Sequence, residues 1–364
     1  MNNFSLVRLP MMTVILTREG EIMKRILCVF MLLMCVGVCQ RMYASAGNRT
    51  GTGGAPELLI PTGARDLAMG GSTISTTSGI EAVFWNPAGI VKSKSSVNLM
   101  FSHLSYIADI GVDYGAASAN FEGVGTLALS IKSLSIGEML VTTTLDPDGT
   151  GQTYSPQFFT AGATFAKQLS DRVSVGLTAN LVTERILEVH TSGFAFNVGV
   201  MYNNLANING LSIGVAIKNI GPQLKYDGPG LYAQGTVAGQ NRSANNVALE
   251  AAPFELPSTF EFGFGYQSIL EGNNSLLFSG TFQNNNFSGD EYKGGFEYGY
   301  NSNFFARLGY SGSPSSQSAD YIYGFTAGVG VEYPLEGVNL AVDYAYRSVK
   351  YFDGNHSISI RLGF

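Results

Sequence analysis

The sequence predicts an all-β protein: a 14-stranded antiparallel transmembrane outer-membrane β-barrel with a short N-terminal hatch segment containing a small helix. Three observations lead to this prediction. Apolar and polar residues alternate with a period of two from residue 97 onward, whereas residues 47–96 do not alternate. Charged residues make up only 13% of the chain, although 45% of it is hydrophobic. Short and long connections alternate between the predicted strands, as they do in barrels of bacterial outer membranes.

The first part of the chain reads as a secretory signal peptide. Lys24 and Arg25 supply a basic region, residues 26–38 an apolar region, and residues 44–46 a cleavage site of small residues. The apolar region is short for a helix that crosses a bilayer, which makes an uncleaved anchor the less favoured alternative. We therefore expect cleavage after Ala46.

The expected cleavage also limits the chemistry of the mature chain. Translation is expected to start at Met23, so residues 1–22 would be an upstream extension. All three cysteines precede residue 47, so the mature chain would have no disulfide and no zinc–thiolate site. Its formal net charge would change from −6 to −9, because five basic and two acidic residues are removed. An acidic chain argues against a nucleic-acid partner.

The barrel is predicted to span residues 97–364. No stretch of about 18 apolar residues follows residue 47, so a closed barrel is the way in which such an apolar secreted chain can satisfy its backbone in lipid. The fourteen predicted strands cover residues 97–106, 112–121, 125–136, 155–168, 173–186, 190–203, 211–220, 258–268, 274–284, 290–301, 304–312, 321–333, 338–348 and 356–364.

The last predicted strand shows the alternation most simply. Ile358, Ile360, Leu362 and Phe364 share one face, whereas Arg361 lies on the other face with small residues. A terminal aromatic residue in an alternating strand is typical of the signal that barrel-assembly machinery recognises. These four residues are therefore predicted to face outer-membrane lipid and to take part in barrel assembly.

The connections predict how the barrel is oriented. Every second connection is a short turn, whereas the interleaved set includes the long segments 137–154, 221–257 and 313–320. Outer-membrane barrels have short periplasmic turns and longer outside loops. This parity predicts that both termini lie in the periplasm.

Several charged residues are predicted to point into the lumen, because they lie on the polar face of their strands. One interpretation is a set of cross-strand ion pairs that brace a narrow interior. The other is that some of these charges hold the hatch through Arg65, Asp66 or Glu81. The predicted lumen-facing charges are Lys218, Glu261, Lys293, Glu297, Arg307, Asp343, Arg347 and Arg361.

The hatch is predicted to span residues 47–96 and to contain one helix over residues 80–85. Ser78 or Gly79 can cap the start of that helix, and Pro87 is expected to end it. Gly89 is expected to give the chain the freedom to turn into the first strand. Trp85, the only tryptophan, is interpreted as a packing anchor against the barrel wall, with a gate or ligand contact as the alternative.

The hatch also resembles a known family. "GARDLAMGGS" followed by "GIEAVFWNPAGI" is similar to the N-terminal signature of the PorV/PorQ family of bacterial outer-membrane proteins, which is related to the FadL fatty-acid transporters. "IKNIGPQL", "LPSTFEFGFGY" and "VDYAYR" extend the resemblance over residues 57–364. The residues that match the hatch signature are Arg65, Met69, Gly70, Gly71, Trp85, Asn86, Pro87, Ala88 and Gly89.

The resemblance implies a barrel with a hatch inside it and a role in protein secretion. PorV-type members serve type IX secretion and contact secreted proteins or secretion-system components, whereas FadL-type members pass hydrophobic small molecules such as long-chain fatty acids. The chain is shorter than FadL and has one very long connection, residues 221–257, which favours the PorV type. His103, His190 and His356 show no ligand-like spacing, and no catalytic motif is present. We therefore expect a non-enzymatic protein without metal or cofactor.

Overall fold

The computed structural model describes residues 52–236, 245–313 and 321–364. All of them belong to one compact unit, residues 46–364. The predicted upstream extension, signal peptide and cleavage after Ala46 lie outside the described residues.

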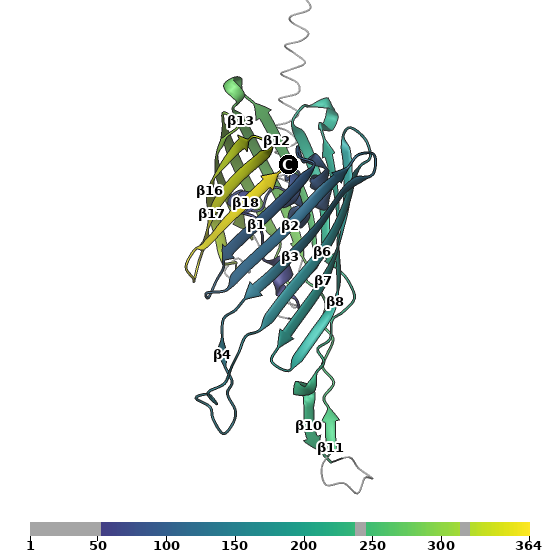
Figure 1. Cartoon of the computed structure of the whole chain (residues 1–364), viewed down its shortest axis with the longest axis vertical. Coiled ribbons are helices and arrows are strands. Elements are labelled where there is room, and N and C mark those ends of the chain that lie inside the picture. Colours follow the sequence, from purple (N-terminus) through teal and green to yellow (C-terminus); the bar gives the residue numbers. More distant parts are fainter. Residues whose placement is uncertain (1–51, 237–244, 314–320) are drawn as a thin grey trace, which may run out of the picture. The chain divides into compact units, whose positions relative to one another are not determined.

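Fourteen antiparallel strands close into a barrel, which confirms the predicted fold (Figure 1). Each barrel strand pairs with the barrel strands before and after it in the chain, and β1 closes the barrel by pairing with β18. The short strands of two long connections lie outside the barrel sheet. The barrel strands are β1 Val97–Ser105, β2 Gly111–Phe121, β3 Gly125–Ser135, β6 Gln157–Gln168, β7 Val173–Ile186, β8 Val189–Asn203, β9 Leu211–Ile220, β12 Thr259–Ile269, β13 Ser275–Asn285, β14 Glu291–Tyr300, β15 Phe304–Gly312, β16 Tyr323–Leu335, β17 Val338–Val349 and β18 Asn355–Gly363.

Two long connections contain hairpins of their own, which the sequence did not predict. The first joins β4, Met139–Leu140, to β5, Thr153–Tyr154, and the second joins β10, Tyr232–Gly235, to β11, Asn245–Ala248. Both extend from the end of the barrel opposite the C-terminus (Figure 1). We call these two ends the long-loop end and the C-terminal end.

The strands present apolar side chains outward and polar side chains inward, as the alternation predicted. In β12, Phe260, Phe262 and Phe264 are exposed on the outer face, whereas Glu261 between them is buried. In β18, Ile358 and Ile360 are exposed outward and Ser359 is buried. Among the described residues, no helix is long and apolar enough to cross a membrane.

The pairing of β1 with β18 closes the barrel and extends as far as Phe364. The register pairs Leu99 with Leu362 and Phe101 with Ile360 across the β1–β18 seam. Beyond β18, the backbone N–H of Phe364 donates to the carbonyl of Val97 at 2.8 Å, and the N–H of Val97 donates back at 3.2 Å. The exposed side chain of Phe364 therefore lies at the C-terminal end of the wall.

The hatch contains more helical turns than the sequence predicted. The expected single helix over residues 80–85 is a 3₁₀ turn followed by one α turn, and the chain then continues as a 3₁₀ helix that starts at Pro87. Proline suits the first position of a helix because its missing N–H is not needed there. The hatch elements are η1 Pro56–Leu59, α2 Ala64–Ala68, η2 Gly79–Glu81, α3 Ala82–Trp85 and η3 Pro87–Lys92; short 3₁₀ turns elsewhere are η4 Leu205–Asn207, η5 Pro229–Leu231 and η6 Glu271–Asn273.

The described chain enters the barrel at the long-loop end. The N–H of Gly54 donates to the carbonyl of Glu255 at 3.0 Å, and Gly53 lies against the ring of Phe287; both partners belong to connections at that end. The first described residues therefore lie at the opposite end from Phe364, because the hatch runs through the lumen before β1 begins. The N-terminus expected at residue 47 lies outside the described residues, so the predicted periplasmic position of both termini stays a prediction.

Candidate functional site

The hatch signature residues pack against the inner wall of the barrel. Gly70 and Gly71 have φ of 68° and 71°, a conformation that favours glycine. A Cβ at Gly70 would lie 2.9 Å from the backbone nitrogen of Tyr310 on β15, and one at Gly71 would lie 2.9 Å from the Trp85 ring. The buried Met69 precedes them. The two glycines therefore allow the hatch backbone to turn and to approach both the wall and the tryptophan.

Trp85 is fixed within the hatch. Its side chain is buried, and its indole N–H donates to the carbonyl of Thr62 at 3.0 Å. Phe84 packs edge-on against it, with the ring centroids 5.2 Å apart. These contacts make Trp85 a link between two segments of the hatch, residues 56–62 and 79–92. The gate function remains a prediction.

Asn86 and Pro87 join the hatch to the wall. Asn86 is extended, with φ −150°, and its side-chain oxygen accepts from the N–H of Ala88 at 3.1 Å. Its amide nitrogen donates to the carbonyl of Ile74 at 2.7 Å. On β8, a Cβ at Gly199 would lie only 2.0 Å from the Asn86 side-chain oxygen, so glycine leaves the space that this side chain occupies. The wall is therefore shaped to accept this corner.

Gly89 acts by close packing, which corrects its predicted role. Its φ is not in the left-handed region, so it does not supply an unusual turn. A Cβ there would lie 2.6 Å from the Thr77 carbonyl oxygen and 2.8 Å from the Ala82 Cβ. Ala88 beside it is fully buried.

A chain of ion pairs holds the hatch against β14. Arg65 in α2 donates from Nε and Nη2 to the two carboxylate oxygens of Glu297, at 3.2 and 3.3 Å. Arg307 on β15 donates to the same carboxylate at 2.5 Å. Glu297 therefore serves a cross-strand pair and a hatch contact at once, which are the two roles that the sequence left open.

The chain of charges continues across three more strands. Arg307 donates to Asp343 on β17 at 2.6 Å, and Asp343 accepts from Arg361 on β18 at 2.8 Å. The Arg307–Asp343 pair crosses above β16, where Gly330 leaves the space for it. Arg361 then approaches Glu81 of the hatch at 3.8 Å. The hatch thus meets this chain of charges at both of its ends, through Arg65 at Glu297 and through Glu81 at Arg361.

Burial changes the proton affinity of the hatch carboxyl groups. Burial raises the pKa of Glu81 to about 7, although the nearby Arg361 acts in the opposite direction. Burial also raises the pKa of Asp66, whose carboxylate accepts from Thr77 at 2.6 Å. Burial and the neighbouring Glu184 carboxyl raise the pKa of Glu57 to about 8. The docked hatch therefore holds protons more tightly than a solvated segment would.

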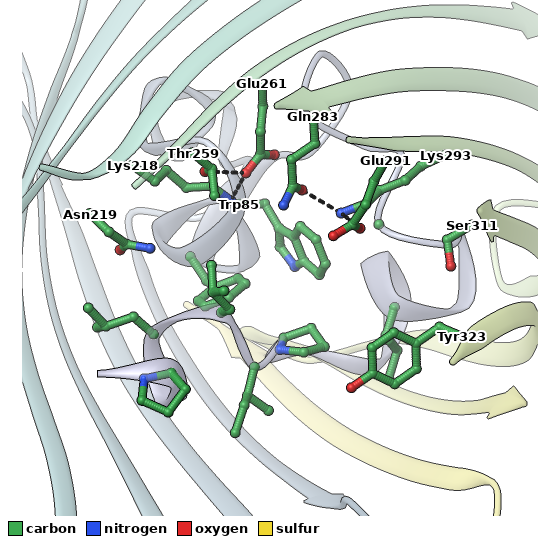
Figure 2. Close-up of a pocket in the computed structure, with 18 of the residues that line it drawn as sticks. Trp85, Lys218, Asn219, Thr259, Glu261, Gln283, Glu291, Lys293, Ser311 and Tyr323 are labelled. Atoms are coloured by element: carbon green, nitrogen blue, oxygen red, sulfur yellow. Dashed lines mark hydrogen bonds and ion pairs between the residues drawn. The ribbon is translucent and has the colours of Figure 1, made fainter. Parts of the chain in front are cut away.

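A cavity of about 380 Å³ lies on the long-loop side of the hatch. We call it the outer cavity. Lys218 pairs with Glu261 at 2.6 Å, and Lys293 donates to Gln283 at 2.5 Å. Figure 2 shows these side chains around Trp85 in the outer cavity. Of the predicted lumen charges, Lys218, Glu261, Lys293 and Arg347 line this cavity, whereas Glu297, Arg307, Asp343 and Arg361 belong to the ion-pair chain.

A second buried cluster, not predicted from the sequence, lies beside the outer cavity. Lys132 on β3 donates to the hatch carbonyls of Glu57 and Ile60, at 2.6 and 2.5 Å. Glu184 on β7 accepts from the hydroxyl of Tyr226, at the root of the connection from β9 to β12. Lys132 and Glu184 lie on the polar face of alternating strands, so the same parity could have found them.

A second cavity of about 320 Å³ lies on the C-terminal side of the hatch. Its lining includes Arg65, Lys92, Asn98 and Arg361. The hatch therefore lies between two cavities within one lumen. In the described part of the chain, no group of three or more His, Cys, Asp or Glu side chains is placed to hold a metal ion.

The family of the chain follows from its sequence. The family model of the type IX secretion system protein PorV matches residues 43–252, which is more than half of the chain and includes the whole hatch signature. The chain belongs to the PorV family. The comparison with curated protein sequences gave no match.

Solved structures with a similar fold include transporters and channels. The Pseudomonas putida toluene transporter TodX has a TM-score of 0.51 and 14% identity, over 84% of this chain and 97% of that one. The Ralstonia pickettii toluene transporter TbuX has a TM-score of 0.50 and 13% identity, over 84% and 98%. The CymD monoaromatic hydrocarbon channel has a TM-score of 0.50 and 14% identity, over 84% and 98%. At such identities the likeness concerns the fold; together with the family, it identifies an outer-membrane β-barrel.

Proposed function

We propose that this PorV-family barrel is a non-enzymatic accessory to protein secretion or surface delivery, acting in a system of type IX character. The observation that carries the proposal is the plugged lumen. Buried contacts such as Arg65–Glu297 and Asn86–Ile74 hold the hatch across the barrel. A barrel closed in this way suits docking of proteins at its surface better than free diffusion through its lumen. The PorV family match supports the same role.

We propose that the C-terminal end faces the periplasm and the long-loop end faces the outside. The short turns gather at the C-terminal end, as periplasmic turns do in other outer-membrane barrels. Under this proposal, residues 1–46 are removed with the signal peptide, residues 47–96 form the hatch and residues 97–364 form the barrel.

The long-loop end provides the surface on which secreted proteins or secretion-system components would bind. Leu140, Leu145, Tyr232 and Leu249 are exposed on the connections that carry the two hairpins; their exposed fractions are 58, 89, 56 and 58%. Exposed apolar groups that cluster on one region of a protein mark interaction sites. The outward wall faces lipid instead, because its apolar residues lie on strands.

The proposal is tested by deleting the gene in its own organism and following secreted proteins. Proteins that carry a C-terminal secretion signal should accumulate in the periplasm, and the wild-type gene should restore them to the surface. A Leu145→Ser variant should still fold, as shown by heat-dependent gel mobility, but should restore secretion less well than the wild-type gene. Lys167→Gln, a change at an exposed polar position, is the matched control and should restore secretion fully. Normal secretion in the deletion strain would refute the proposal.

A FadL-like transporter of long-chain fatty acids or other hydrophobic compounds is the second candidate. The observation in its favour is the pair of cavities on the two sides of the hatch, because a moving hatch would connect them. The two candidates separate in the same deletion strain. Lost uptake of a labelled fatty acid with intact secretion supports transport, whereas intact uptake with lost secretion supports the accessory role.

A further inference from the structure

The connection from β9 to β12 is pinched together where it leaves and rejoins the barrel. We call residues 221–228 and 253–257 the two roots of this connection. The N–H of Leu224 donates to the carbonyl of Phe254 at 2.9 Å, and the N–H of Phe254 donates back to the carbonyl of Leu224 at 2.8 Å. The hairpin β10–β11 lies beyond this backbone bridge. The bridged roots therefore connect the hairpin to the barrel.

The roots cover an early part of the hatch, residues 54–60, which we call the entry segment. The N–H of Gly54 donates to the carbonyl of Glu255 at 3.0 Å. A Cβ at Gly54 would lie 1.7 Å from the ring of Phe254, so this ring rests on the hatch backbone itself. Apolar residues of the hatch, the roots and the wall form one buried cluster at this place: Ala55, Leu58, Leu224, Leu256, Val182 and Ala195. The entry segment is therefore enclosed between the roots and the wall.

The first root is also bonded to the wall. The hydroxyl of Tyr226 donates to Glu184 on β7, and the ring centroid of Tyr226 lies 5.4 Å from that of Phe254. The next residue, Asp227, exchanges backbone N–H···O bonds of 2.8 and 2.9 Å with His190 on β8. The bond of Tyr226 depends on its side chain. One substitution can therefore remove this bond and leave the backbone pairing of the root in place.

The rest of the hatch is held by contacts of another kind. Just after the entry segment, the carbonyl of Thr62 accepts from the indole N–H of Trp85 at 3.0 Å. Further along, Arg65 bonds to β14, and Thr326 on β16 donates to the carbonyl of Ala68 at 2.8 Å. These bonds go to the wall strands and not to the roots. A segment with its own set of contacts can open while the remaining structure stays folded.

We propose that the two roots form a latch over the entry segment, and that this latch opens without undocking the rest of the hatch. Opening separates the roots from the Gly54 backbone and exposes the buried cluster around Ala55. The entry segment also lines the outer cavity through Leu58, Leu59 and Ile60, so an open latch alters one side of that cavity. The latch does not depend on the proposed secretion role. Under that role, binding of a protein to the β10–β11 hairpin would reach the hatch through the latch.

Maleimide labelling of an introduced cysteine measures how often the latch opens in the purified barrel in detergent. Ala55→Cys reports on the entry segment, and Ala64→Cys reports on the part of the hatch that the wall holds; both alanines are fully buried. Labelling is followed by mass spectrometry of the peptide that carries the reporter, so the natural cysteines before residue 47 do not interfere. Each reporter is combined with Tyr226→Phe, which removes the bond to Glu184. Tyr232→Phe, at an exposed position of the hairpin, is the matched control.

Tyr226→Phe is expected to speed the labelling of Ala55→Cys about tenfold, because it removes a hydrogen bond that holds the latch closed. The labelling rate of Ala64→Cys should stay the same, and Tyr232→Phe should change neither rate. An unchanged rate at Ala55→Cys, or equal acceleration of both reporters by Tyr226→Phe, would overturn the proposal. If Ala55→Cys lacks heat-dependent gel mobility, Leu58→Cys replaces it as the reporter and is judged by the same two outcomes.

Discussion

Replacing Gly330 with alanine should break the ion-pair chain that surrounds the hatch. A Cβ at this position would lie 2.1 Å from the Asp343 carboxylate oxygen and 2.5 Å from Nη1 of Arg307. These are the two atoms that bond to each other at 2.6 Å above β16. The added methyl group cannot fit unless the pair separates.

The size of the effect follows from what is lost and what is kept. Separating the pair removes a hydrogen bond between charged groups, which contributes about 1.5–3 kcal/mol. Displacing side chains in a packed interior adds about 1–3 kcal/mol. Arg307 keeps Glu297 and Asp343 keeps Arg361, so the charges are not left unpaired. The free energy of unfolding should therefore fall by about 2.5–6 kcal/mol.

The assay is equilibrium unfolding in urea of the barrel refolded into lipid vesicles, followed by Trp85 fluorescence. Gly294→Ala on β14 is the matched control, because a Cβ there would meet nothing within 4 Å. Alanine at Gly330 should also cost less in an Asp343→Ala background, since the clashing carboxylate is gone. Equal stability of Gly330→Ala and Gly294→Ala would refute the reasoning.

Three further predictions concern the hatch. Trp85→Phe should keep the ring but lose the bond to Thr62, which should lower stability by about 1 kcal/mol and increase protease cleavage of the hatch; unchanged cleavage would contradict the anchor role. Asn86→Ala should cost about 2–3 kcal/mol in urea unfolding, because it removes the bonds to Ile74 and Ala88 and leaves a buried carbonyl unpaired, whereas Asn246→Ala at an exposed position of β11 should cost little. The pKa values of Glu57 and Glu81, about 8 and 7 in the docked hatch, are raised from about 4.5, so the stability that these two groups contribute to the hatch should be fully present below pH 4.5 and should be lost as the pH rises to 8. Glu57→Gln should flatten the upper part of this decrease in a protease-protection assay, and an unchanged pH profile would contradict it.

Strand positions and faces could be predicted because they depend on a local pattern. Alternation places Phe262 outward and Glu261 inward whatever the rest of the chain does. The same alternation also gave the number of barrel strands, which the structure confirms. The hairpins β4–β5 and β10–β11 were not predicted, since two to four residues per strand are too few for the pattern to emerge.

The contacts inside the lumen could be predicted only in part. Parity gave the inward direction of Arg307 and Asp343, but not that they would meet across an intervening strand at a glycine. Their meeting depends on wall curvature, which the sequence does not express. The position of the first described residues at the long-loop end could not be predicted either, because the path of a non-alternating segment through a lumen depends on tertiary packing. The end of the predicted helix at residue 85 is confirmed, whereas the 3₁₀ helix that follows from Pro87 was not predicted, because Pro87 starts this new helix as well as ending the previous one.

The seam between β1 and β18 sets an order of events during biogenesis. The wall closes where β1, which directly follows the hatch, pairs with β18, the last of the barrel strands along the chain. The cylinder cannot shut until both of these strands are in place. Because the hatch enters at one mouth and leaves at the other, it must be laid along the open sheet before the seam zips. Assembly of this protein is therefore closer to wrapping a wall around its plug than to inserting a plug into a finished pore.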